Sequence, residues 1–260
     1  MSEEASVGKS AAPLPFAAPC RLLAAAAPLR WIRLGWQDFR RAPRQSLVYG
    51  AAIVALSWFV TGIGLKLGSY WAALVLLSGF VFVAPVLAIG LYSISRQLDL
   101  GQAPSLARCA AEVGKALGTA MVYALALLVL FLVWARAGSM VHVFFPVRSN
   151  PDWGQLAGFL AIGTAVGSIF ALLTFMFSAF SLPMICDREV DAITAIVSSV
   201  NAVLRNKPAM VLWAVLIGVL TAVGFATVFV GLVIIMPWLA YATWHAYRET
   251  LQPGDWPMLD

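Results

Sequence analysis

Five long stretches of this 260-residue chain contain no Asp, Glu, Lys or Arg, and each is at least 20 residues long. They are Ser46–Leu65, Tyr70–Ser95, Ala116–Ala135, Gln155–Cys186 and Ala209–Trp244. A helix rises about 1.5 Å per residue, so about 20 apolar residues cross the roughly 30 Å hydrocarbon core of a bilayer. The sequence therefore predicts an all-α, polytopic helical membrane protein.

The composition supports a membrane location and argues against nucleic acid as a partner. Hydrophobic residues make up 62% of the chain and charged residues 11%, whereas about 25% of a soluble domain is charged. The net charge is +5, but 7 of the 17 Lys and Arg precede residue 45 and flank the first uncharged run. Basic residues beside a span face lipid headgroups. We therefore expect anionic headgroups of the bilayer as the partner, and no nucleic acid.

The last uncharged run is too long for one span. Its 36 residues would form a helix of about 54 Å, so we expect two helices that fold back near Gly224–Phe229. We interpret Gln155–Cys186 as one span that leaves the membrane around Leu182-Pro183, where proline interrupts the helix. Six spans in three hairpins result, at about 46–65, 70–94, 116–135, 156–182, 209–226 and 229–247.

The transmembrane domain is expected to cover residues 29–250, between a disordered tail over residues 1–28 and a short C-terminal tail over residues 251–260. With six spans, 14 of the 17 Lys and Arg lie on the side of both termini. Lys66, Arg136 and Arg148 lie on the other side. Because cytoplasmic loops carry the excess of Lys and Arg, we expect both termini in the cytoplasm.

Prolines near the ends of three predicted spans suggest a repeated hairpin with helix breaks at Pro85, Pro183 and Pro237. Pro85 and Pro237 are each followed by an aromatic residue at +7 and an arginine at +11, namely Tyr92 and Arg96, and Trp244 and Arg248. Such repeats can frame a transport path. They also pack as a plain bundle, because a proline near water is tolerated. We favour the bundle, since these prolines lie in the cytoplasmic third of their spans.

Two amphipathic helices are predicted to lie on the membrane surface. In Leu29–Arg44 a lipid-facing basic stripe is formed by Arg30, Arg33, Arg40 and Arg44, beside an apolar face of Leu29, Ile32, Trp36 and Phe39. In Val190–Arg205 a polar stripe is formed by Asp191, Thr194, Ser198, Asn201 and Arg205. Helical spacing of this kind is typical of interfacial helices.

Glycines four residues apart occur within two of the predicted helical segments. They are Gly114 with Gly118 and Gly163 with Gly167. Small residues at this spacing let helix backbones approach closely, so both pairs predict helix contacts.

The densest polar cluster follows Pro183 and contains Asp187, Arg188 and Asp191. These groups could bind a cation, a headgroup or a basic partner surface. In the alternative that we favour, the cluster caps the following helix, and Asp187 pairs with Arg188 or a nearby arginine. His245 lies between aromatic residues, and we expect it to anchor the chain at the interface rather than to act as a ligand or proton carrier.

The residue pattern predicts no cofactor, no metal and no catalytic site. His142 and His245 are expected on opposite membrane faces, about 30 Å apart, so they cannot share a metal or a haem. The cysteines Cys20, Cys109 and Cys186 are too widely spaced for a disulfide or metal motif. No charged residue or histidine lies at the centre of a predicted span, which disfavours proton-coupled transport.

Six short motifs together resemble one family. They are Trp36–Pro43, Ser181–Met184, Asp187-Arg188, Asp191-Ala192, Asn206–Met210 and Ala242–Arg248. They resemble the bacterial integral membrane family catalogued as domain of unknown function 2189. The resemblance covers about residues 30–250 and is most specific over 180–248. It implies a multi-pass protein of the bacterial inner (cytoplasmic) membrane and no established activity.

We therefore expect a non-enzymatic scaffold, assembly or accessory factor that works beside another membrane protein complex. The alternative is a small transporter or channel for an uncharged or lipid-like solute. A third hypothesis, which we disfavour, is an intramembrane enzyme that acts on lipid through the cluster at Cys186–Asp191.

Overall fold

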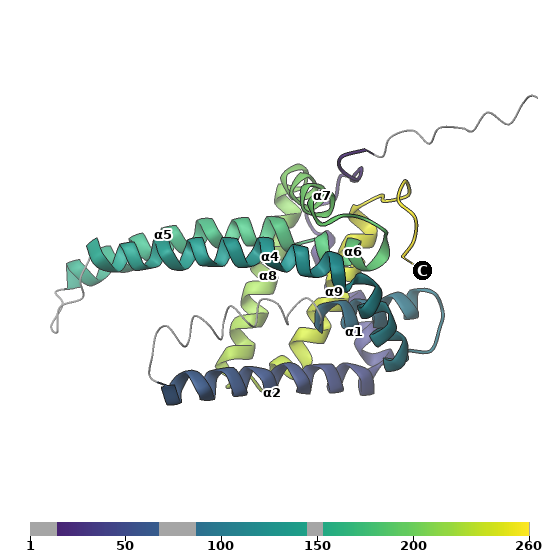
Figure 1. The fold of residues 1–260 in the computed structure, drawn as a ribbon, viewed down its shortest axis with the longest axis horizontal. Coiled ribbons are helices and arrows are strands. Elements are labelled where there is room, and N and C mark those ends of the chain that lie inside the picture. The colour runs from purple at the N-terminus through teal and green to yellow at the C-terminus, as the bar shows by residue number, and fades with distance from the viewer. Residues whose placement is uncertain (1–14, 68–86, 145–152, 260) are drawn as a thin grey trace, which may run out of the picture.

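The chain folds into helices, as predicted. The computed structural model describes residues 15–67, 87–144 and 153–259. Its helices are α1 (Ala27–Arg41), α2 (Pro43–Leu67), α4 (Leu106–Phe144), α5 (Trp153–Ser178), α6 (Ser181–Asp187), α7 (Ala192–Arg205), α8 (Lys207–Ala226) and α9 (Leu232–Thr250), and residues 87–99 form a further helix. α4 and α5 run side by side and project from the rest, and α8 and α9 lie between this pair and α2 (Figure 1).

Four segments in the described ranges are long and apolar enough to cross a membrane. They are Pro43–Ile63, Leu106–Met140, Ala157–Asp187 and Lys207–Ala226, and they overlap the first, third, fourth and fifth predicted spans. The second predicted span, 70–94, lies largely outside the described residues. The sixth lies in α9, whose C-terminal half carries His245, Arg248 and Glu249 and is not among the four.

The last uncharged run folds back where predicted. α8 ends at Ala226 and α9 begins at Leu232. In the turn, Thr227 Oγ1 donates to the Gly224 carbonyl and accepts from the Gly231 N–H, both at 2.8 Å. Val228 and Phe229 adopt φ angles of 54° and 68°, which cost about 1–2 kcal/mol for each side chain with a Cβ. The Thr227 hydrogen bonds offset part of that cost.

The fourth run breaks earlier than predicted. α5 ends at Ser178 and α6 begins at Ser181, so the interruption precedes Pro183. A proline in the first turn of a helix is tolerated, but its ring clashes with the carbonyl four residues earlier, so α5 cannot continue through it. At the break, Ser199 Oγ of α7 accepts the Phe180 N–H at 3.1 Å. Packing against α7 therefore satisfies the backbone where the helix stops.

α9 packs between α1 and α2, and glycines permit the close approach. A Cβ at Gly35 of α1 would lie 2.6 Å from the Ala242 nitrogen, and one at Gly50 of α2 would lie 2.0 Å from the Val233 carbonyl oxygen. Both distances are far inside van der Waals contact. Only glycine therefore fits at these two crossings without moving a backbone.

Pro237 does not break α9, contrary to the prediction. The helix is continuous around it. A proline cannot donate to the carbonyl four residues earlier, here that of Val233. This is the carbonyl against which Gly50 packs, so α2 covers the point where the hydrogen-bond ladder is interrupted. Pro85, the remaining predicted break, lies outside the described residues.

The predicted glycine contacts on α4 and α5 are not made within the described chain. A Cβ added at Gly114, Gly118, Gly163 or Gly167 would meet no described atom within 4 Å. Close helix approach at these glycines therefore stays a prediction. Among the described residues their sites are open.

Residues 15–26 are packed, which differs from the disordered tail expected over residues 1–28. The Ala18 N–H donates to Ser198 Oγ and the Leu23 N–H to Asn206 Oδ1, both at 2.8 Å. The Arg21 N–H donates to the Thr250 carbonyl at 2.8 Å. Side chains of α7 and its C-cap, together with the end of α9, therefore pair with this backbone. Residues 1–14 lie outside the described part.

The expected C-terminal tail also packs. Trp256 is buried, and the Gln252 N–H donates to the Pro19 carbonyl at 2.9 Å. The first and last described segments thus lie side by side at one end of the molecule.

The predicted interfacial helix Leu29–Arg44 is two helices. α1 ends at Arg41 and α2 contains Arg44, so the basic stripe is divided between them. Arg30 pairs with Glu249 of α9, whereas Arg33, Arg40 and Arg44 are exposed. From the apolar face, Phe39 is buried in a cluster with Tyr241 of α9. α9 therefore takes up part of the face that was expected to meet lipid.

The middle of the polar stripe of α7 faces the protein, while Asp191 and Arg205 at its ends are exposed. Thr194 and Ser198 are buried, while Ile193 and Leu204 are exposed. The reason is that hydroxyl groups of α7 accept hydrogen bonds from buried backbone. Ser198 accepts from Ala18 in residues 15–26, and Ser199 accepts from Phe180 at the α5–α6 break. Two large apolar residues of this helix, Ile193 and Leu204, are left on the surface.

Candidate functional site

Asp187, the last residue of α6, lies at the centre of a network of charged groups that we call the Asp187 network. Its side chain is 5% exposed. Arg96 Nε lies 3.7 Å from Oδ1, and Arg188 Nε and Arg248 Nη1 lie 3.1 and 3.8 Å from Oδ2. The Tyr247 hydroxyl donates to Oδ2 at 2.7 Å. Three arginines and a phenol from different parts of the chain thus share one carboxylate.

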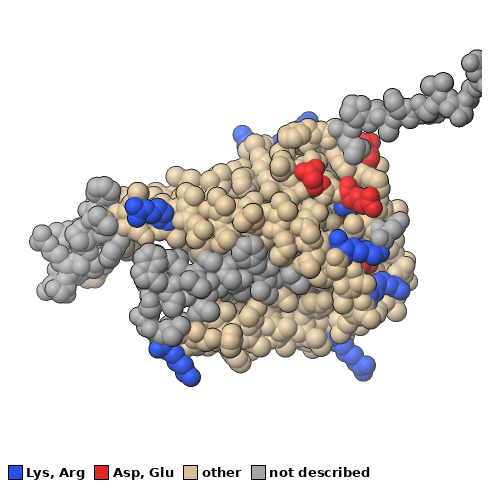
Figure 2. Space-filling view, in the orientation of Figure 1, with Lys and Arg blue, Asp and Glu red and all other residues tan. Residues whose placement is uncertain are grey.

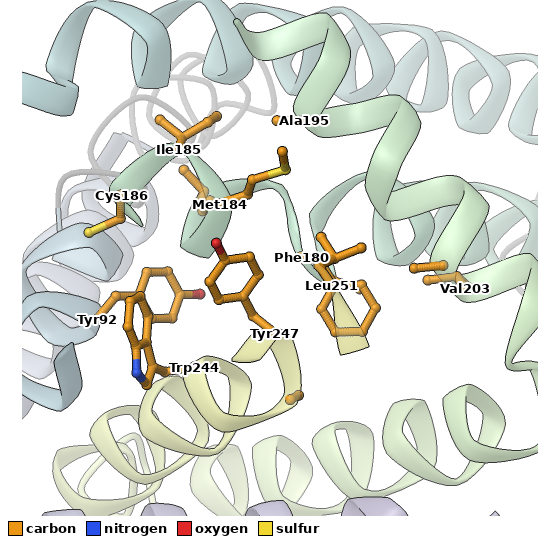
Figure 3. Packing of buried hydrophobic residues seen from close by; sticks show 14 of the residues in the cluster. Tyr92, Phe180, Met184, Ile185, Cys186, Ala195, Val203, Trp244, Tyr247 and Leu251 are labelled. Carbon is orange, nitrogen blue, oxygen red and sulfur yellow. The ribbon is translucent and has the colours of Figure 1, made fainter. Parts of the chain in front are cut away.

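Helical spacing places the partners of Asp187. Tyr92, Arg96 and Asp99 follow one face of helix 87–99, and Trp244, Tyr247 and Arg248 follow one face of α9. The Tyr92, Trp244 and Tyr247 rings meet beneath α6, beside Cys186 (Figure 3). Trp244 Nε1 donates to Asp99 Oδ2 at 2.7 Å. These bonds fix helix 87–99 to α9.

The C-terminal segment closes over the Asp187 network. Arg188 Nη1 donates to the Trp256 carbonyl at 3.0 Å. The Leu259 N–H donates to the Asp187 carbonyl at 3.1 Å, and the Arg96 guanidinium donates to the Leu259 carbonyl at 3.3 and 3.4 Å. The arginines are therefore engaged by backbone as well as by the carboxylate.

A second buried polar cluster joins α1, helix 87–99 and α9. Asp38 Oδ2 accepts from Ser95 Oγ at 2.5 Å and lies 2.7 Å from His245 Nε2. Asp38 is 3% exposed. His245 is thus a partly buried bridge between α9 and α1, and its predicted anchoring at the membrane interface stays a prediction.

Glu112 of α4 lies at the edge of the Asp187 network. Its Oε1 is 3.9 Å from Arg96 Nη1, and its Oε2 is buried without a hydrogen-bond partner in the described chain. Arg96 therefore links two carboxylates, one on α6 and one on α4.

Asp191 caps α7, as predicted. Its Oδ1 accepts from the N–H groups of Ile193 and Thr194 at 2.9 Å each. Partial burial acts to raise the pKa of this carboxyl, but the hydrogen bonds from Thr194 and Ile193 outweigh burial and hold the pKa below its ordinary value. Asp191 takes no part in the Asp187 network.

The structure brings together some of the predicted site residues and separates others. Asp187 pairs with Arg188, as favoured, while His245 belongs to the Asp38 cluster. Arg96 and Arg248, noticed only as arginines at +11 after two prolines, meet at Asp187. Sequence reasoning missed Asp38, Asp99 and Glu112 as partners of neighbouring helices. Each lies in a segment that could equally have been the solvated end of a span.

The described carboxylates at this end join helices to one another. Within the described ranges no group of three or more His, Cys, Asp and Glu side chains is placed to hold a metal ion. Asp187, Asp38 and Asp99 each accept from a neighbouring helix. On the face shown in Figure 2, acidic side chains gather at this end, while the surface along α4 and α5 is mostly uncharged.

Comparison with known families supports the resemblance. Residues 73–187 match the family model described as predicted integral membrane protein, DUF2189. The match ends at Asp187, so it includes Arg96, Glu112 and Asp187 of the charged network. It reaches only the first residues of the 180–248 region predicted to be most specific. Neither a curated protein nor a solved structure matches the chain.

Proposed function

We propose that this integral membrane protein is a non-enzymatic scaffold, assembly or accessory factor of the bacterial inner membrane, with both termini in the cytoplasm. The α4–α5 pair carries the proposal. It projects from the other helices (Figure 1), and large apolar side chains on both helices are exposed, among them Val122, Val129 and Leu132 of α4 and Leu160 and Ile169 of α5. Helices of a partner protein would find an apolar surface here.

The open glycines support docking of another helix on this pair. Gly163 has no described atom within 4 Å of its Cβ position. In a bilayer, helices associate through small residues that let backbones approach. A surface with unused small residues between exposed apolar side chains suits a partner helix.

The opposite end of the molecule supports a structural rather than a catalytic role. Asp187 and Asp38 are held by arginine, tyrosine, serine and histidine partners from three or more chain segments. Groups engaged in this way tie helices together. The first and last described segments lie at this end, and the excess of Lys and Arg there favours the cytoplasmic side.

Changing Gly163 to leucine tests the scaffold. The substitution fills space that is empty within the described chain, so the fold should remain while a partner helix is excluded. Co-purifying membrane proteins are quantified by mass spectrometry after mild detergent extraction from native membranes. We expect a reproducible partner for the wild type and for the control Gly62→Leu on α2, whose site is also open, and a loss of about tenfold for Gly163→Leu.

Two outcomes would count against the scaffold. One is recovery of the wild-type protein alone from native membranes. The other is an identical set of partners for Gly163→Leu and the wild type.

Transport of an uncharged or lipid-like solute is the second candidate. A cavity of about 590 Å³ favours it, lined by side chains that include Tyr92, Trp134, Phe170 and Trp213. Gly167 also lines this cavity, so Gly167→Phe should block the flux of an uncharged dye in liposomes while Gly163→Leu leaves it unchanged. Absence of flux with the wild-type protein would remove this candidate.

A further inference from the structure

A groove of about 290 Å³ lies between α1 and α9, lined by Leu29, Ile32, Arg33, Trp36 and Trp238. Leu29, Ile32 and Trp36 recur at helical spacing and form one ridge of α1. Trp238 supplies the α9 side. The groove is therefore apolar on the α1 ridge and on the Trp238 side, and Arg33 places a positive charge at its edge.

The walls of the groove are preformed. Trp238 Nε1 donates to the Ile32 carbonyl at 2.8 Å, which fixes the indole across the two helices. The Trp36 and Trp238 rings are 5.1 Å apart, and Trp36 stacks on Phe39 at 5.3 Å. Trp36 remains 38% exposed and Leu29 56% exposed. A ligand would thus meet a fixed apolar surface that is open from outside.

The charge beside the groove is positive and uncompensated within the described chain. Arg33 and Arg40 are seven residues apart and lie along the same edge of α1, and both are exposed. Neither makes an ion pair with a described residue, whereas Arg30 is paired with Glu249. The only acidic residue of α1, Asp38, is buried and bound to Ser95 and His245. An occupant with a negative group next to an apolar body would satisfy both features.

We propose that this groove binds one anionic glycerophospholipid, with an acyl chain lying along the Trp36 and Trp238 rings and the phosphate on the Arg33 guanidinium. Guanidinium groups bind phosphate through paired, charge-assisted hydrogen bonds. Tryptophan side chains favour the depth at which acyl chains meet headgroups. The inference depends on the membrane location in the proposed function, but not on a partner for α4 and α5.

The volume favours a lipid chain over a helix of a partner protein. One helical turn with its side chains, about 10 Å across and 5.4 Å high, occupies about 420 Å³. The groove offers about 290 Å³. An extended acyl chain is thinner than a helix and can lie along this groove. A helix is too wide to fit between its walls.

Lipid retention measured by native mass spectrometry tests the site. The full-length protein is equilibrated in mixed micelles with equal amounts of phosphatidylglycerol and phosphatidylcholine, and the bound lipid is then identified. The wild type should retain phosphatidylglycerol in preference to phosphatidylcholine. Arg33→Gln should reduce phosphatidylglycerol retention about tenfold, and Arg33→Lys should restore part of it.

A matched control distinguishes a site from general attraction. Arg41→Gln removes the same charge from the same helix, but Arg41 does not line the groove, so retention should be unchanged. Trp36→Ala should weaken both lipids alike, because it removes a wall that touches the chain rather than the headgroup. Trp153→Ala, at a tryptophan that is 83% exposed on α5, should have no effect.

Three results would overturn the proposal. They are equal retention of the two lipids by the wild type, an equal loss for Arg41→Gln and Arg33→Gln, and full retention by Trp36→Ala. Thermal unfolding of each variant is measured in parallel, and wild-type stability for Arg33→Gln is expected because that side chain is exposed. A lost preference for phosphatidylglycerol with intact co-purification of partner proteins would separate failure of this site from failure of the scaffold.

Discussion

The helices around α9 pack closely against one another, whereas the α4–α5 pair leaves much of its surface exposed. Around α9, Gly35 and Gly50 bring neighbouring backbones into direct contact, and buried carboxylates tie the helix ends together. Along α4 and α5, no described atom lies within 4 Å of a Cβ placed at Gly118 or Gly163, and apolar side chains are exposed. The first region is stabilised by contacts within the chain, whereas the second depends on what surrounds the protein.

The comparison shows that a glycine in an apolar helix does not by itself predict a helix contact. Gly163 with Gly167 has the spacing of a helix-contact motif, yet neither meets a described neighbour. Gly35 and Gly50 have no such motif, and a Cβ at either would collide with α9. Which glycine is a contact depends on which helix lies opposite.

The largest expected effect is at the Asp187 network. Asp187→Ala leaves Arg96 and Arg188 without their buried counter-charge, so the free energy of unfolding should fall by about 3–5 kcal/mol. It is measured by titrating sodium dodecyl sulfate into micelles of the protein and following circular dichroism. Asp255→Ala, at an exposed residue, is the control and should change it by less than about 0.5 kcal/mol. Equal stabilities of the two variants would show that the network contributes little.

A methyl group at Gly50 should have the next largest effect. The Cβ would collide with the Val233 carbonyl, which is backbone and cannot rotate away. Gly50→Ala should therefore lower the free energy of unfolding by about 1–3 kcal/mol. The same titration gives the value. An unchanged stability would mean that α2 and α9 can separate at no cost.

Loss of the α7 cap should cost less. Asp191→Ala removes the acceptor for two N–H groups, which should lower stability by about 1 kcal/mol. Because the pKa of Asp191 is lower in the folded protein, its contribution is present above the pKa of the unfolded state and is lost as pH falls through the folded value. The stability difference between wild type and Asp191→Asn should therefore shrink between pH 6 and about pH 3. A difference that grows on acidification would contradict this assignment.

The smallest effect is expected on α4. Gly118→Ala adds a methyl group where no described atom lies within 4 Å, so stability should change by no more than about 0.5 kcal/mol. The free energies of unfolding of Gly118→Ala and Gly50→Ala, measured by the same titration, compare the two regions. A loss as large as that of Gly50→Ala would mean that α4 packs as tightly as α9.

The features that sequence reasoning predicted are local ones. The turn near Gly224–Phe229, the Asp191 cap and the pairing of Asp187 with Arg188 depend on neighbours within a few residues. The continuity of α9 at Pro237 and the contact of His245 with Asp38 were not predicted, because both depend on distant segments. Gly50 of α2 covers the carbonyl that Pro237 leaves free, and Asp38 of α1 binds His245.

The sequence by itself determined that this chain lives in lipid, because uncharged runs of 20 residues or more cannot be covered by so small a protein in water. It also determined where the last uncharged run turns, since chain length and bilayer thickness leave little choice. Only the tertiary structure decided that arginines at positions 96 and 248 share the Asp187 carboxylate. The convergence of side chains from distant segments is set by how helices pack, and helical spacing alone does not specify that.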